Sequence, residues 1–355
     1  MVKKIHFLGA RLKISQLREK TVLPYQKIKM IKTILERQPE LEQYRKSKVT
    51  RGESTGFKEL DKLWSVKQGT FTIVFSEPTH GKSEFIFEAC INQAERHQKR
   101  SLIYSPETGD FNAVVAELFH KMTGKEMIKD SYFGCEDKEF YNHLAALNDQ
   151  FLVIDAEDRS LSIKELFEMA AEWEKFNPGK KIDIIVGEPY NELSHDMNGF
   201  GGRQDLYIED LMTELRRYCT KTKKHFFLSI HPASSMAITE KKVTYYPKPL
   251  PRNAAGGQAL YRKAMTWITL WRPPVDLLAD SGFAYQKNEV HVFVDKAKPK
   301  GVSFKGKAIM YFDWQRNRYY EDYGTGKRYA FQHEKPEFQQ ADIFQAPTEE
   351  KELPF

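Results

Sequence analysis

Eight consecutive residues have the types and order of a loop that binds phosphate. They are Ser76, Glu77, Pro78, Thr79, His80, Gly81, Lys82 and Ser83. In such a loop, successive backbone N–H groups and the N-terminus of the next helix surround a phosphate. We expect Lys82 to neutralise the β- and γ-phosphate oxygens, the Ser83 hydroxyl to ligate Mg²⁺, and Gly81 to let the backbone approach closely. The loop therefore predicts a site for ATP and Mg²⁺.

The first position of the loop departs from the usual glycine, because Ser76 stands there. Serine is small but is less free than glycine to adopt positive φ, so the start of the loop can differ. The same motif could also be a loop that only caps a helix. The context favours the phosphate site, since a β-branched run ends at Phe75 and a helical pattern begins at Ser83.

Alternating strands and helices must hold this loop in place. Short apolar runs separated by helical patterns are typical of a mainly parallel sheet covered by helices on both faces. The expected strands are 70–75, 101–104, 151–154, 182–186 and 225–230, and the expected helices are 83–98, 111–123 and 207–221. After Val290 the pattern changes to β-hairpins, with strands expected at 291–295 and 308–312. We therefore expect an α/β fold with a parallel core and late hairpins.

Composition excludes several classes of protein. The chain has 355 residues, 41% hydrophobic and 13% aromatic, so it is neither a disordered chain nor a coiled-coil rod. No apolar run approaches the roughly 20 residues that span a bilayer, and we expect no membrane partner. The spacing of Cys90, Cys135 and Cys219 fits neither a zinc site nor a disulfide framework, which favours a reducing compartment. The net charge of +6 permits a polyanionic partner without requiring one.

Three parts of the chain differ in pattern. Residues 1–50 are rich in Lys and Arg and carry apolar residues at helical spacing, so we expect a helical arm or linker. Residues 51–325 carry the alternating pattern of the α/β domain, and residues 326–355, rich in Pro, Gln and Glu, are expected to form a flexible tail. The first 20 residues faintly resemble a mitochondrial presequence, but we expect a basic helix without a targeting role.

The segment before the phosphate loop carries a more specific resemblance. It consists of Ser54, Thr55, Gly56, Phe57, Lys58, Glu59, Leu60, Asp61, Lys62 and Leu63, followed by Gly69, a strand and the loop. This layout resembles the start of the RecA-like core in the DnaB and Twinkle replicative ring helicases, and RecA, RadA and KaiC relatives share parts of it. The resemblance implies a RecA-like P-loop NTPase core of phage or bacterial type. We expect no primase domain, because residues 1–50 are too short for one and hold none of its zinc ligands.

The resemblance assigns two carboxylates to ATP hydrolysis. Glu107 follows the strand 101–104 and matches the glutamate that activates the attacking water in these helicases. We expect that strand to lie next to the strand of the phosphate loop, which would bring Glu107 to the γ-phosphate. Glu188 closes a hydrophobic strand and matches the acid that orders Mg²⁺, although family members usually have Asp there.

Two further residues match positions that respond to the nucleotide. His231 follows the strand 225–230, where these helicases have a Gln or His that senses the γ-phosphate and transmits its presence to a DNA-binding loop. Lys298 stands where the family has an arginine that reaches the nucleotide of the neighbouring subunit. Lysine supplies positive charge but not the bidentate fork of arginine, so its effect should be weaker. Together with Ser76 and Glu188, this change leaves open a slow or inactive ATPase.

Basic residues lie between the strand 225–230 and Trp267, where these rings have their central DNA-contacting loop. They include Lys241, Lys242, Lys248 and Arg252. Basic residues in a flexible segment can follow the phosphate chain of single-stranded DNA without regard to sequence. The alternative is a solvated insertion with no ligand.

Two short segments of the tail resemble docking peptides. Gln340, Ile343 and Phe344 match the peptide by which bacterial replication proteins bind the sliding clamp, and the acidic residues 349–355 resemble the tail of single-stranded-DNA-binding proteins. Aromatic residues in a polar tail can become ordered on binding. The alternative is a tail without a partner.

The expected function is that of an ATP-dependent replicative DNA helicase that forms a homo-hexameric ring and moves along single-stranded DNA. The expected location is the cytoplasm of a bacterial cell or phage-infected host, with the mitochondrial matrix as the alternative. Two other functions stay open: a RadA- or recombinase-like ATPase, and a slow or inactive nucleotide-gated DNA-binding scaffold.

Overall fold

The computed structural model describes residues 31–46, 51–156, 159–240, 242–278, 282–298 and 303–331. The chain divides into two compact units, residues 1–50 and 51–355. In the first unit, a 3₁₀ turn at Leu35–Arg37 leads into α2 (Gln38–Lys46). Four residues with predicted contacts lie outside the described residues, namely Lys241, Gln340, Ile343 and Phe344. Within the described ranges, no helix has both the length and the apolar character needed to cross a bilayer.

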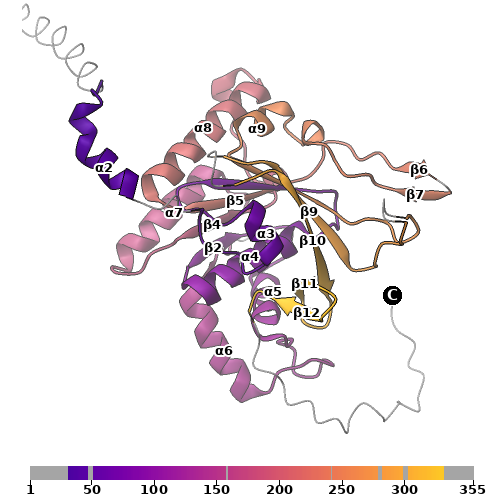
Figure 1. Cartoon of the computed structure of the whole chain (residues 1–355). Helices are drawn as coiled ribbons and strands as arrows, with labels where there is room; N and C mark the ends of the chain where they lie inside the picture. Colours follow the sequence, from indigo (N-terminus) through magenta and orange to yellow (C-terminus); the bar gives the residue numbers. More distant parts are fainter. Residues whose placement is uncertain are drawn as a thin grey trace, which may run out of the picture. The chain divides into compact units, whose positions relative to one another are not determined.

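A ten-stranded sheet forms the centre of the second unit, in the order β12-β11-β10-β9-β8-β1-β5-β4-β2-β3 over the described residues. The strands from β8 to β3 in that order run parallel, as predicted, and β9 to β12 extend the sheet in antiparallel pairs (Figure 1). The bounds are β1 (Phe71–Phe75), β2 (Ser101–Tyr104), β3 (Phe151–Val153), β4 (Ile184–Gly187), β5 (His225–Ile230), β8 (Thr266–Trp271), β9 (Glu289–Lys296), β10 (Gly306–Asp313), β11 (Arg318–Asp322) and β12 (Lys327–Tyr329).

Helices cover both faces of the parallel strands. One core holds side chains of α4 (Lys82–His97), α5 (Phe111–Thr123) and α6 (Asp137–Gln150), and the other holds those of α7 (Ile163–Phe176), α8 (Gln204–Thr222) and α9 (Gln258–Lys263). All residues of β1 are buried, because its alternating side chains enter both cores: Val74 the first and Ile73 the second. Packing on both faces fixes the position from which the phosphate loop leaves the sheet.

The strand order corrects one prediction. The prediction that β2 lies next to β1 is wrong, because β5 and β8 flank β1, and both β5 and β4 lie between β1 and β2. The reason is physical: buried parallel strands all read as short apolar runs, so their sequences do not say which strands pair. The sequence analysis also did not predict strand β8. The predicted late hairpin is confirmed, because β9 and β10 pair in antiparallel orientation.

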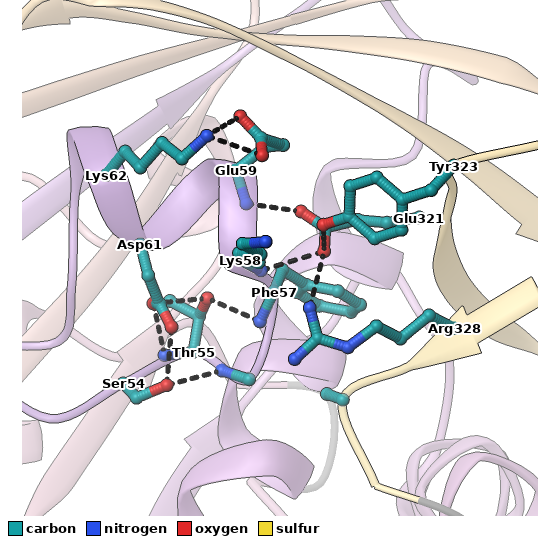
Figure 2. Close-up of polar contacts among 12 residues, drawn as sticks. Ser54, Thr55, Phe57, Lys58, Glu59, Asp61, Lys62, Glu321, Tyr323 and Arg328 are labelled. Atoms are coloured by element: carbon teal, nitrogen blue, oxygen red, sulfur yellow. Dashed lines mark hydrogen bonds and ion pairs between the residues drawn. The ribbon is translucent and has the colours of Figure 1, made fainter.

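The segment with the family resemblance closes the domain onto its last strands. Asp61, in the short helix α3 (Lys58–Leu63), accepts hydrogen bonds from the backbone N–H and the hydroxyl of Thr55 at 2.7 and 2.8 Å. Glu321 of β11 accepts the backbone N–H groups of Lys58 and Glu59 at 2.8 and 2.6 Å, so it satisfies the first turn of α3 (Figure 2). This segment is therefore a structural clasp between the start and the end of the domain.

Replacing Glu321 with alanine should destabilise the domain. The carboxylate is 2% exposed and also accepts the hydroxyl of Tyr323 at 2.6 Å and pairs with Arg328 at 3.5 Å. Its loss would leave two helix N–H groups and a cation without their partner, at a cost of about 2–4 kcal/mol. Urea unfolding followed by circular dichroism would measure this loss beside Glu168→Ala, which removes an exposed glutamate of α7. Equal effects of the two variants would contradict the clasp.

Candidate nucleotide-binding site

The phosphate loop connects β1 to α4 at the carboxyl end of the parallel strands. Gly81 precedes the helix with φ 84° and ψ 35°, and Thr79 also has positive φ, at 63°. These left-handed residues curl the loop so that backbone N–H groups at the start of α4 face a common hollow. Ser76, the departure from the usual glycine, is fully buried, and its hydroxyl donates to the carbonyl of Glu77 at 2.8 Å.

Lys82 folds back onto this loop. Its Nζ lies 3.4 Å from the carbonyl oxygen of Ser76 and 3.3 Å from that of Glu77. Burial lowers the pKa of Lys82 to about 8, and the carboxylates of Glu107, Glu188 and Glu77 act against that shift. Long contacts to neutral carbonyls satisfy a buried ammonium poorly, so the loop presents a cation ready to bind an anion.

Glu188 lies at the end of β4, beside the start of α4. Its Oε1 accepts the Ser105 hydroxyl at 2.8 Å, and its buried Oε2 has no hydrogen-bond partner among the residues that the structure describes. Burial raises the pKa of Glu188 to about 7, while the hydroxyls of Ser105 and Ser83 act in the opposite direction. Glu188 and Ser83 therefore lie close together, and the Mg²⁺ site predicted for them stays a prediction.

These two residues fit a magnesium ion bound together with phosphate. The described part of the chain contains no group of three or more His, Cys, Asp or Glu side chains able to hold a metal. Mg²⁺ does not require such a group, because it usually keeps several waters and binds one or two protein ligands plus substrate phosphates. The unpaired oxygen of Glu188 is consistent with that arrangement.

Glu107 and His231 are brought together at the same edge of the sheet. His231 follows β5, and its Nε2 lies 3.0 Å from Oε2 of Glu107, which follows β2. His231 follows β5, which is a direct neighbour of β1, the strand that leads into the phosphate loop. Glu107 follows β2, which is separated from β1 by β5 and β4. Glu107 still lines the cavity at the phosphate loop, although β2 is not adjacent to β1.

The phosphate loop opens into a cavity of about 400 Å³. Arg272, Trp314 and Tyr319 line it but were absent from the predicted site. The Arg272 guanidinium lies 5.4 Å from the centre of the Trp314 ring, and the Arg272 backbone N–H approaches Nδ1 of His80 at 3.5 Å. Burial, Arg272 and Lys82 together lower the pKa of His80 to about 4, so this ring is neutral at pH 7. Arg272 directly follows β8. Had the sequence analysis predicted that strand, Arg272 would have stood out as a charged residue at the end of a parallel strand.

The predicted nucleic-acid residues divide into two kinds. Lys242 lies at the turn of the hairpin β6 (Ile238–Glu240) and β7 (Val243–Tyr245), which extends away from the sheet (Figure 1). Arg252 is exposed in a 3₁₀ turn at Pro251–Asn253. Lys248 instead pairs with Asp295 of β9 at 2.6 Å and lies 4.1 Å over the Phe293 ring. Lys248 therefore holds its segment against β9. It is not exposed to solvent in the way that Lys242 and Arg252 are.

Lys298 does not line the cavity at the chain's own phosphate loop. It lines a separate hollow of about 660 Å³ with Lys67, Arg216 and Lys223, at the end of the sheet where β1 begins. Burial lowers the pKa of Lys296 to about 8, and the charges of Lys298, Arg216 and Lys305 act in the same direction. Lys298 therefore does not join the other predicted catalytic residues within one chain.

Replacing Gly81 with alanine should disrupt the loop through a specific clash. An added Cβ would stand 2.7 Å from the hydroxyl oxygen of Tyr319 and would also take positive φ. Gly202→Ala is the matched control, because Gly202 has φ 75° with nothing within 4 Å of the added Cβ, so it carries only backbone strain of about 1–2 kcal/mol. We expect Gly81→Ala to lose more unfolding free energy than Gly202→Ala in urea. Adding Tyr319→Phe should recover the difference, and no recovery would contradict the clash.

The buried carboxyl of Glu188 should make stability depend on pH. Its pKa rises from an ordinary 4.5 to about 7, so the folded protein holds this proton more tightly than the unfolded chain. The stabilising contribution is full below pH 4.5 and is lost as the pH rises to about 7. We expect Glu188→Gln to reduce the fall in unfolding free energy across that window, measured by urea unfolding at several pH values. Parallel curves for the two proteins would contradict the assignment.

Comparisons with known proteins agree with this fold. No protein-family model matches the chain. The Twinkle homolog protein of Arabidopsis thaliana, described as chloroplastic/mitochondrial, is 28% identical over 197 residues, which cover 51% of this chain and 26% of that protein. The chain therefore matches only about a quarter of that relative's length.

Solved structures show the same architecture. One solved ATPase domain matches with a TM-score of 0.62 and 16% identity, over 81% of this chain and 98% of that one. A second match is a DnaB-like replicative helicase, whose structure was described together with its interactions with primase. It has a TM-score of 0.62 and 16% identity over 87% of this chain and 73% of that one. The chain therefore shares its α/β fold with a solved ATPase domain and with a DnaB-like replicative helicase, and part of its sequence is similar to the Twinkle homolog.

Proposed function

We propose that this protein is an ATP-dependent replicative DNA helicase that moves along single-stranded DNA as a homo-hexameric ring. The observation that supports it most is that Lys82, Ser83 and Glu107 line one cavity, and that the buried Glu188 carboxyl is close enough to Lys82 and Ser83 to interact with both. These residues come from three places in the chain, because Lys82 and Ser83 begin α4, Glu107 follows β2 and Glu188 follows β4. A triphosphate in the cavity would lie against the start of α4. That arrangement suits phosphoryl transfer to water, because such catalysis depends mainly on positioning and charge.

Within this proposal, each residue has a defined task. Backbone N–H groups of the loop and Lys82 bind the β- and γ-phosphates. Mg²⁺, held by Ser83 and Glu188, would neutralise charge that develops on the phosphates. Glu107 takes the proton of the attacking water, and His231 orients the Glu107 carboxylate through their 3.0 Å contact. Arg272 and Trp314 form the wall on which the base would lie.

The proposed DNA contact is the hairpin β6–β7 with the segment that follows it. Lys242 and Arg252 are exposed and can contact phosphates, and we propose the same role for Lys241. Lys248 anchors this segment to β9 and would act indirectly. In a ring, Lys298 would reach the nucleotide of the adjacent copy. Arg216 lines the same hollow and could supply the guanidinium that Lys298 lacks.

A second function has specific support. Ser76, Glu188 and Lys298 all depart from the family pattern, and the pKa of Glu188 at about 7 leaves the metal-binding carboxylate partly protonated at neutral pH. A slow or inactive nucleotide-gated DNA-binding scaffold would show nucleotide binding without turnover. A recombinase-like ATPase would instead form filaments.

The proposal also includes partners and a location. We propose that Gln340, Ile343 and Phe344 dock on a sliding clamp, that the tail makes other replisome contacts, and that the protein is cytoplasmic.

ATP turnover with and without single-stranded DNA tests the proposed helicase. We expect oligo-dT to stimulate turnover, and Lys82→Ala to reduce the stimulated rate by about 100-fold or more, because it removes the main phosphate cation. Lys138→Ala is the matched control, since it removes an exposed lysine of α6 remote in sequence from the loop.

Three outcomes separate the candidate functions. Turnover that is lost in Lys82→Ala, together with unwinding of a forked duplex, supports the helicase. Nucleotide binding without turnover contradicts it and supports the scaffold. Particle images with an ATP analogue and DNA distinguish a closed ring from a filament, and a filament without unwinding supports the recombinase-like ATPase.

A further inference from the structure

Glu77 places a carboxylate inside the phosphate loop, and no task in the proposed function uses it. The residue is 5% exposed. Its backbone carbonyl accepts the Ser76 hydroxyl at 2.8 Å and the Lys82 ammonium at 3.3 Å, so its main chain belongs to the loop. Its side chain contacts a different segment, where the hydroxyl of Ser235 donates a hydrogen bond to Oε2. A buried carboxylate requires such a donor, because it has left water.

Ser235 stands at the base of the segment that carries the hairpin β6–β7. This segment leaves β5 and is closed by two backbone hydrogen bonds, from Ala233 N to the Asn253 carbonyl at 2.7 Å and from Ala255 N to the His231 carbonyl at 2.9 Å. Ser235 lies just beyond this closure and shortly before β6 begins. The Glu77–Ser235 hydrogen bond therefore joins the phosphate loop directly to the base of the hairpin.

This contact is separate from the one made by His231. The pair of His231 and Glu107 joins the hairpin segment to β2, whereas Glu77 joins it to the loop that would hold the phosphates. The segment is thus attached to the candidate site at two points, in the loops that follow β1 and β2. Only the Glu77 attachment lies within the phosphate loop itself.

A bound triphosphate would act on Glu77 through charge. Glu77 is close enough to Lys82 to raise its pKa, so phosphates drawn to Lys82 would approach a negative side chain. Lys82 would at the same time leave the Glu77 carbonyl for the phosphate oxygens. The repulsion between the phosphates and the Glu77 carboxylate weakens the arrangement in which Glu77 holds Ser235. Occupancy of the loop and formation of this hydrogen bond therefore oppose each other, and such linkage is reciprocal.

We propose that Glu77 and Ser235 form a positioning contact that couples the phosphate loop to the hairpin β6–β7: the contact holds the hairpin base while the loop is empty and is released when phosphates bind. The inference rests on the proposed function, since it takes a nucleoside triphosphate at the loop and single-stranded DNA at the hairpin as the two ligands. DNA that binds the released hairpin should tighten nucleotide binding, and nucleotide should tighten DNA binding by the same factor.

The test measures this coupling factor in the full chain. A fluorescent non-hydrolysable ATP analogue is titrated with and without saturating oligo-dT, and the ratio of the two Kd values is compared among variants. In the unaltered protein we expect a ratio of about 5 or more, the lower range of measured couplings. Glu77→Gln and Ser235→Ala should each bring the ratio close to 1, and the double variant should add nothing further. Glu77→Gln should also tighten nucleotide binding without DNA, because it removes the repulsion.

Two control variants separate the loss of the Glu77–Ser235 hydrogen bond from a general structural effect of substitution. Ser234→Ala removes the exposed hydroxyl next to Ser235 and should keep the ratio of the unaltered protein, and Ser235→Thr should keep it because the hydroxyl remains. A ratio unchanged in Ser235→Ala overturns the inference even if Glu77→Gln fails to fold. A ratio of 1 in an unaltered protein that binds both ligands also overturns it while the proposed function stands. Absence of nucleotide binding, with Lys82→Ala behaving identically, refutes the proposed function and this inference with it.

Discussion

The candidate site depends on one geometric constraint: parallel strands in a sheet end at a common edge. The phosphate loop follows β1, His231 follows β5, Glu188 follows β4 and Glu107 follows β2. These strands are buried on both faces, so packing on two cores holds each strand end in position. Residues widely separated in the sequence can therefore act together without any flexible element having to bring them there.

Much of this edge was predictable, because each strand and the residue after it are contiguous in the sequence. The apolar run before the loop, the acid after β4 and the histidine after β5 are local signals. Strand order was not predictable, since buried parallel strands look alike, and β2 was misplaced for that reason. Arg272, Trp314 and Tyr319 were missed because they follow β8 or lie in the antiparallel half, which reaches the cavity only through tertiary packing. The ion pair of Lys248 has no local signal at all.

The antiparallel half is fixed to the phosphate-loop helix by a buried polar network. The guanidinium of Arg318, with no exposed surface, donates to Glu88 of α4 at 2.8 and 2.9 Å and to Asn92 at 2.9 Å. A buried pair of this kind adds little net stability but strongly disfavours arrangements that separate its members. Because Tyr319 is the next residue, the network places its hydroxyl 3.3 Å from the Gly81 carbonyl. The far strands thus help to shape the loop.

The clasp around α3 also determines how the backbone of the domain is connected in space. Ser54 and Ala330 are held to the same helix, since Gln93 donates to the Ser54 carbonyl at 2.8 Å and Arg96 donates to the Ala330 carbonyl at 2.8 Å. Chain segments near the start and the end of the described part of the domain therefore lie side by side along α4. The domain's backbone is almost a closed loop, which is the arrangement that tolerates circular permutation and insertion of the whole domain into another protein.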